Sequence, residues 1–181
     1  MSDNDKKVMV RIPTYGPIDR GLSRWMHWAG KHHPEWDVQI YYQTAGVCET
    51  RNEIAGQFMD SGATHLWMID HDVTPPEDDN ILRHDHPVVS GLYGHYHPQA
   101  GANYQVYKEA ENGYTFLQER EWGETPEGGT FPAKAVGLGC IVITKAVFTR
   151  ITDELKTLPF LFEYKEGRRV GEDFTFCAHL E

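Results

Sequence analysis

The sequence predicts an α/β fold in which a mostly parallel central sheet is flanked by helices. Up to residue 72, short apolar runs alternate with segments that carry apolar residues at helical spacing, the order of strands joined by crossover helices. One of these runs, residues 66–69, is continuously apolar, as a buried strand of such a sheet is. The chain has 181 residues, of which 40% are hydrophobic, and this suits a single domain over residues 1–181 with a sizeable core.

The first half of the chain divides into clearly bounded elements. Three strands are expected, at residues 8–12, 36–42 and 65–70. The helix between the first two follows a turn that ends at Pro17, a residue suited to a first helical turn, and it closes at Gly30. The next helix has Ile54 and Phe58 on one face and Gly62 as its stop. This β-α-β-α-β order predicts parallel pairing with right-handed crossovers.

The second half is expected to be less regular. The expected elements are, in order, a short helix near 75–79, a strand at 87–93, a small antiparallel excursion within 94–132 that includes an exposed acidic loop at 119–129, a core strand at 135–144, a helix at 145–155, a short strand at 160–164 and a final helix that opens at 171–173. Gly137 and Gly139 lie inside the core strand, where glycine marks a bulge or a close approach more often than a ligand contact.

The composition restricts the classes of partner and compartment. A formal net charge of −10 argues against a nucleic-acid partner, because a grip on the phosphate backbone requires clustered Lys and Arg. Cys48, Cys140 and Cys177 are few and widely spaced, which indicates a reducing compartment rather than a disulfide scaffold. The N-terminus lacks the apolar core of a signal peptide, and no apolar run approaches the roughly 18 residues of a membrane span. We therefore expect a cytoplasmic protein with no integral membrane segment.

Two carboxylates, Asp70 and Asp72, directly follow the continuously apolar strand. Ligands of α/β sheets bind outside the carboxyl ends of the strands, and two carboxylates there offer the hard oxygen ligands that divalent cations prefer. A bound cation can in turn neutralise a diphosphate. The pattern by itself also fits a solvated acidic turn, so the metal interpretation requires supporting motifs elsewhere in the chain.

Further motifs accompany this pair in a fixed order. They are Ile12-Pro13-Thr14-Tyr15 after the first strand, Arg51-Asn52 in the second helix, the segments 66–72 and 135–143, and Gly171-Glu172-Asp173-Phe174. In this set the chain resembles the family 2-like glycosyltransferases of the GT-A fold, over residues 8 to 178. The resemblance implies a compact GT-A-like domain that moves a sugar from a nucleotide-sugar donor to an acceptor hydroxyl.

The resemblance assigns roles residue by residue. Asp70 and Asp72 match the Asp-x-Asp (DXD) pair that holds Mn²⁺ or Mg²⁺, and Asp173 matches the general base, with Glu172 beside it. The nucleotide-sugar contacts that it implies are Pro13, Thr14, Tyr15, Arg51, Asn52, Asp70 and Gly139. Many members of the family add a later histidine that completes the metal site. This sequence ends at position 181 and His179 is expected to face elsewhere, so we expect another side chain or water to complete the shell, or weak metal binding.

These assignments predict a metal-dependent transfer that inverts the anomeric carbon. The metal would act as a Lewis acid on the diphosphate leaving group, and Arg51 would add charge-assisted hydrogen bonds to the phosphate oxygens. Asp173 would take the proton of the acceptor hydroxyl as that hydroxyl attacks. The acceptor itself, whether a glycan, a protein or a small molecule, is not specified by these residues.

Other interpretations stay open at this point. A shortened glycosyltransferase fold could serve as a non-catalytic binding or assembly protein. Two histidine pairs, His84 with His86 and His95 with His97, have the spacing that places both imidazoles on one face of a strand. They are either surface residues or ligands of a transition metal, and the second pair could then serve a nucleotide-activating transferase or a metal hydrolase. Arg51 is equally compatible with a structural salt bridge.

Overall fold

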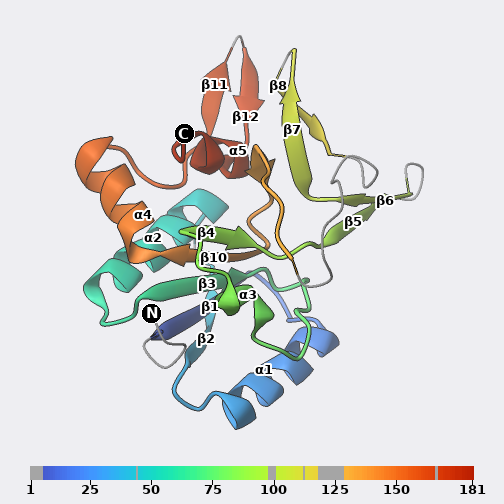
Figure 1. The fold of residues 1–181 in the computed structure, drawn as a ribbon, viewed down its shortest axis with the longest axis vertical. Helices are drawn as coiled ribbons and strands as arrows, with labels where there is room; N and C mark the ends of the chain where they lie inside the picture. The colour runs from blue at the N-terminus through green and yellow to red at the C-terminus, as the bar shows by residue number, and fades with distance from the viewer. Residues whose placement is uncertain (1–5, 44, 98–100, 112, 118–128, 166) are drawn as a thin grey trace.

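The described part of the chain folds around a five-stranded sheet with helices on both faces (Figure 1). The computed structural model describes residues 6–43, 45–97, 101–111, 113–117, 129–165 and 167–181. The strand order is β2-β1-β3-β10-β4, with β1 at Val8–Thr14, β2 at Asp37–Tyr42, β3 at His65–Ile69, β10 at Cys140–Thr144 and β4 at Val88–Ser90. The predicted α/β class is therefore confirmed.

The sheet is mixed in direction, which corrects the expectation of a mostly parallel sheet. β1 pairs in parallel with β2 and with β3, as the β-α-β-α-β order predicts. β10 is antiparallel to β3 and also to β4. The chain enters β10 at Cys140, which lies opposite Ile69 at the C-terminal end of β3, and β10 must therefore run back along β3.

Side chains alternate along β1 and so divide the core between the two faces of the sheet. Val8 and Val10 pack with α1, Arg20–His32, whereas Met9 packs on the other face. Three helices lie on that second face: α2 (Val47–Asp60), α4 (Lys145–Thr149) and α5 (Glu172–Ala178). Helix α4 continues as a π-helical turn over Arg150–Glu154. Within the described ranges, no helix combines the length and apolar character that a membrane span requires.

The segment between β4 and β10 forms small antiparallel units, as its alternating pattern predicts. One unit is a hairpin of β5 (Gly94–His97) and β6 (Gly101–Tyr104). The other is a three-stranded sheet in which β7 (Val106–Ala110) pairs with β8 (Gly113–Phe116) and with β9 (Ala135–Val136). The expected acidic loop at 119–129 falls outside the described residues except for its last position. Figure 1 shows β7 and β8 above the central sheet and β5 and β6 to its right.

Two expected strands differ from those observed. The strand expected at 135–144 is interrupted at residues 137–139, which separate β9 from β10. The strand expected at 160–164 begins later and forms a hairpin of β11, Glu163–Lys165, with β12, Arg168–Val170. Gly167 in the hairpin turn has φ of 77°, a conformation that glycine adopts without strain. The short helix α3, Asn80–Arg83, follows the proline-rich segment, close to where it was expected.

Candidate functional site

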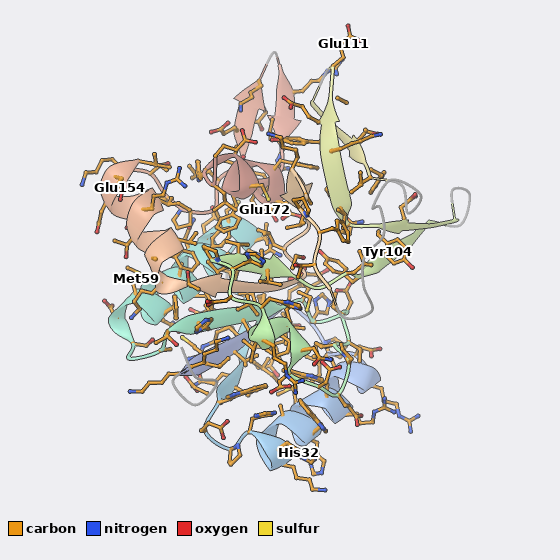
Figure 2. The ribbon with its side chains drawn as sticks, viewed as in Figure 1. His32, Met59, Tyr104, Glu111, Glu154 and Glu172 are labelled. Atoms are coloured by element: carbon orange, nitrogen blue, oxygen red, sulfur yellow. The ribbon has the colours of Figure 1, made fainter. Side chains whose placement is uncertain are left out.

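Three of the predicted site residues surround the buried guanidinium of a fourth, Arg51. The side chain of Arg51 is only 4% exposed, and its Nη1 donates to Glu172 at 2.8 Å and to Asp173 at 3.2 Å. Its Nη2 donates to both carboxylate oxygens of Asp70, at 3.1 and 3.2 Å. We call these three acids around Arg51 the carboxylate cluster. Figure 2 labels Glu172 at the start of α5, between the central sheet and the β11–β12 hairpin.

Arg51 and the three acids of the carboxylate cluster each lie near one end of a secondary-structure element. Arg51 lies in the second turn of α2, and Asp70 follows the last residue of β3. Glu172 and Asp173 form the first turn of α5, where the helix dipole favours negative charge. The cluster therefore lies at the C-terminal end of β3, the edge of the sheet at which α/β proteins bind ligands.

Burial and repulsion make Asp173 a weaker acid than an ordinary aspartate. Burial raises the pKa of Asp173 from 3.8 to about 6, Arg51 opposes this rise, and the charges of Glu172 and Asp70 add to it. Burial also disfavours the charged form of Arg51, but the three carboxylates outweigh that cost and raise its pKa. The cluster thus keeps its guanidinium charged, while Asp173 changes protonation state near pH 6.

Tyr93, which no sequence motif singled out, supports the backbone beside the cluster. Its hydroxyl accepts a hydrogen bond from Gly139 N at 2.7 Å, and Gly139 O accepts one from Asp70 N at 2.8 Å. A Cβ at Gly139 would lie 2.8 Å from the Tyr93 ring, and a Cβ at Gly137 would overlap the Tyr93 hydroxyl. The two glycines therefore allow a close approach, and their position inside the strand expected at 135–144 was the available signal for it.

Asp72 lies outside the carboxylate cluster. It is exposed in the turn after β3, which a hydrogen bond from Val73 N to Asp70 O closes at 3.0 Å. Next to it, His71 packs edge to face against Tyr15, with ring centroids 4.9 Å apart. Among the residues that the structure describes, none forms a hydrogen bond or ion pair with the Asp72 carboxylate. The Asp-x-Asp pair therefore presents one carboxylate bound to Arg51 and one that is exposed to solvent.

Three other residues predicted to contact a nucleotide sugar make internal contacts. Pro13 and Thr14 are buried in β1, and the Thr14 hydroxyl donates a hydrogen bond within the following turn. The Asn52 side chain donates to Phe160 O at 2.7 Å and accepts from Phe160 N at 3.1 Å. The two residues of the Arg-Asn motif thus have different contacts. Arg51 donates hydrogen bonds to the carboxylates, whereas Asn52 connects α2 to the segment before β11 through its hydrogen bonds with Phe160.

The paired histidines do not form a metal centre in the described part of the chain. His84 is half-buried and His86 is exposed, and both line a groove of about 1,140 Å³ beside β4. His95 and His97 belong to β5, and their side chains lie outside what the structure describes. No group of three or more His, Cys, Asp or Glu side chains within the described ranges is arranged to hold a metal ion.

Function has to be argued from this geometry and its chemistry, because comparison with known proteins assigns no family. No protein-family model matches the chain, and no curated protein matches it either.

Proposed function

We propose that this protein is a metal-dependent glycosyltransferase that moves a sugar from a nucleotide-sugar donor to an acceptor hydroxyl with inversion. The observation that supports this most directly is the carboxylate cluster, in which Asp70, Glu172 and Asp173 lie within 3.2 Å of one guanidinium. The resemblance to GT-A glycosyltransferases assigns Asp70 to the metal pair and Asp173 to the base, with Glu172 beside it. We accordingly propose that the mixed sheet, with β10 reversed beside β3, is GT-A-like.

The charge of the site favours a divalent cation as cofactor. Asp70, Asp72, Glu172 and Asp173 outnumber the single guanidinium, so a nucleoside diphosphate would be repelled without a compensating cation. Asp70, 33% exposed, and the exposed Asp72 offer hard oxygen ligands. Mg²⁺ commonly takes one or two protein carboxylates and completes its shell with water and substrate phosphates. The residues therefore fit Mn²⁺ or Mg²⁺, which when bound would stabilise the negative charge of the leaving diphosphate.

Asp173 is the general base in this proposal. Its side chain is 31% exposed, and a pKa of about 6 is close to the pH at which a carboxylate base is effective. The bond from the acceptor oxygen to the anomeric carbon forms as the bond to the diphosphate oxygen breaks. The nucleoside diphosphate leaves with the bonding electrons, and the hydroxyl proton passes to Asp173. Glu172, beside this base, raises the pKa of Asp173.

Arg51 acts on the carboxylates rather than on the diphosphate in this mechanism. Both of its Nη atoms already donate to carboxylates, and the residue is buried. Such charge-assisted hydrogen bonds fix the direction of their acceptors. Arg51 therefore orients Asp70 and Asp173 toward one shared space, and it opposes protonation of the base.

Exposed aromatic rings at the same edge of the sheet as the cluster provide a surface for the nucleotide base. Tyr15 is 78% exposed and Tyr42 is 68% exposed. They lie at the ends of neighbouring strands, because Thr14 and Tyr42 are partners in the β1–β2 register. Bases stack on aromatic faces with little sequence preference. In this proposal the contact expected from the Pro13-Thr14-Tyr15 turn therefore rests mainly on Tyr15.

Donor binding is the first test of the proposal. Thermal unfolding would be followed with UDP-, GDP-, CMP- and dTDP-sugars, with Mn²⁺ and with EDTA. We expect metal-dependent stabilisation by one nucleotide class, worth about 2.7 kcal/mol when the ligand is at about 100 times its dissociation constant. Asp72→Ala should remove this stabilisation, whereas the matched control Asp60→Ala, at an exposed position of α2, should retain it. The absence of donor binding with metal present would refute the proposal.

Transfer is the second test, measured as release of nucleoside diphosphate in the presence of candidate acceptors. Asp173→Asn should lower kcat by about 10²-fold or more, since it removes the base, while the dissociation constant of the donor changes little. Undiminished transfer by this variant would contradict the assigned base. Donor binding without turnover in the unmodified protein, whatever the acceptor, would favour the non-catalytic binding or assembly protein instead.

A further inference from the structure

We propose that the small sheet of β7, β8 and β9 holds Asp173 in place, and that Tyr107 and Tyr114 are the residues of this sheet that position it. They act through Phe174, which follows Asp173 directly in the first turn of α5. This inference rests on the proposed function in one respect, since Asp173 is the base only in that proposal. The contacts themselves, and their effect on the carboxyl group, can be tested without any transfer activity.

Phe174 lies among aromatic rings of the β7–β8 hairpin. The ring of Tyr114 stacks on it, with centroids 4.8 Å apart and planes at 12°. The ring of Tyr107 meets it edge to face, with centroids also 4.8 Å apart, and stacks in turn on Phe116 at 5.0 Å. Aromatic pairs favour these two arrangements. Phe174 is therefore held by contacts of defined direction and not by apolar burial alone.

A second contact attaches the same face of α5 to this sheet. The Cys177 sulfur accepts a hydrogen bond from Val136 N of β9 at 3.5 Å and donates one to Val136 O at 3.7 Å. Phe174 and Cys177 are three residues apart, so they lie on one face of the helix. Helix α5 has only seven residues, too few for a helix that is stable by itself. Its position therefore depends on packing contacts such as these with the sheet beside it (Figure 1).

Arg51 alone is a weak constraint on Asp173. Its Nη1 is shared between two acceptors, and it lies 2.8 Å from Glu172 but 3.2 Å from Asp173. A charge-assisted hydrogen bond is strongest at the shorter of these distances, so Glu172 is the closer partner and Asp173 requires a further constraint. Successive residues of a helix point about 100° apart. A fixed ring at Phe174 therefore also fixes the direction in which the Asp173 side chain leaves α5.

The sheet also contributes to the burial of Asp173. Burial raises the pKa of Tyr107, and the charge of Asp173 adds to this rise, so the phenol lies near the carboxyl group. The Tyr107 hydroxyl donates to Gln105. Among the described residues, the charged or titratable groups around Asp173 are Arg51, Asp70, Glu172, Tyr93, Tyr107 and Cys177. Because burial is the largest cause of the raised pKa of Asp173, opening the contact between α5 and the sheet should lower that pKa.

The test follows the carboxyl carbon of Asp173 by NMR in ¹³C-labelled protein, and Asp173→Asn identifies its signal by loss. In the unmodified protein the pKa of Asp173 should be about 6. Tyr114→Ala removes the stacked ring and should lower this pKa to about 5 or below, since the carboxyl group gains water. Tyr114→Phe keeps the ring and should leave the pKa near 6. If Tyr114→Ala does not fold, Tyr114→Leu removes the stacking, retains apolar bulk and should shift the pKa in the same direction.

Tyr164→Ala is the matched control for these variants. Tyr164 is 75% exposed on the β11–β12 hairpin, and it has no ring contact in the described part of the chain. Its replacement should leave the pKa of Asp173 unchanged. The proposal is overturned if Asp173 titrates with the same pKa in the folded Tyr114→Ala or Tyr114→Leu variant as in the unmodified protein. It is also overturned if Tyr164→Ala lowers that pKa by the same amount.

Transfer rates separate this inference from the proposed function. With an acceptor that the unmodified protein uses, Tyr114→Ala should lower kcat about tenfold or more, because it misplaces the base. The acid limb of the pH–kcat/KM profile should move to lower pH together with the pKa of Asp173, while the Kd of the donor stays unchanged. A lowered pKa with an unmoved profile would refute Asp173 as the base and still support its attachment to the sheet. An unchanged pKa in a variant that transfers sugar normally would refute the positioning role and leave the transferase proposal intact.

Discussion

Replacement of Asp173 by Asn should stabilise the protein at high pH while it removes the proposed base. Burial raises the pKa of this carboxyl group from its ordinary value of 3.8 to about 6. A group whose pKa is higher in the folded state contributes stability that is fully present below the unfolded pKa. That contribution is lost as the pH rises through the folded pKa. The unmodified protein should therefore lose this contribution between about pH 4 and pH 7, and the variant should not.

The magnitude follows from the two pKa values. The full shift of about two units corresponds to about 3 kcal/mol. Between pH 5 and pH 8, a group with these two pKa values loses about 1.4 kcal/mol of that contribution. The Asp173 side chain is 31% exposed, and solvent screening reduces the expected loss to about 1 kcal/mol. The difference in free energy of unfolding between the variant and the unmodified protein should thus rise by about 1 kcal/mol from pH 5 to pH 8.

Urea unfolding at pH 5, 6, 7 and 8 measures this difference, because titrating groups far from Asp173 contribute equally to both proteins. Asp60→Asn, at an exposed position of α2, is the matched control and should show no change with pH relative to the unmodified protein. If Asp173→Asn gives a difference that is flat or falls with pH, the folded protein does not disfavour the ionised carboxylate, and the electrostatic argument for a tuned base fails.

Three further predictions follow from the site. Gly139→Ala should cost about 1–3 kcal/mol of stability, because the added Cβ would lie 2.8 Å from the Tyr93 ring. The control Gly56→Ala, at an open helical position, should be neutral or stabilising. Equal urea midpoints for the two variants would contradict this prediction. Asn52→Ala should lower the free energy of unfolding by about 1–3 kcal/mol, because it leaves the backbone N–H and C=O of Phe160 without their hydrogen-bond partner. Calorimetry that shows no loss of stability would contradict this structural role of Asn52. If Asp173 is the base, kcat/KM should fall about tenfold per pH unit below about pH 6, and a flat pH–rate profile would exclude that role.

The elements of the first half could be predicted from the sequence because their signals are local. Apolar spacing identified α1 and α2, and the continuous run at 66–69 identified β3. The direction of β10 could not be predicted in the same way. It depends on where the chain re-enters the sheet after the antiparallel excursion, and that is a long-range property without a local pattern.

In the candidate site, too, features with a local sequence signal could be predicted and long-range contacts could not. The strand-end rule placed Asp70 correctly at the C-terminal end of β3, and the glycines at 137 and 139 signalled a close approach. The partner in that approach, Tyr93, lies 46 residues away from Gly139 in the chain and carries no motif. Asn52 was expected to contact a nucleotide sugar, but its side chain binds the backbone of Phe160. Every residue type carries the same backbone carbonyl, and nearly every type the same N–H, so the sequence gives no sign of such a partner.

The guanidinium of Arg51 also affects how this protein can fold. Its ion pairs with Glu172 and Asp173 span 121 and 122 residues of sequence, and contacts of such separation form late because they close a long loop. Until they form, the buried cation has only Asp70 as its acidic partner. The β-α-β-α-β half therefore supplies only one of the three carboxylates that hold this buried guanidinium, and we expect a fragment that ends before α5 to remain incompletely folded until a peptide containing that helix is supplied.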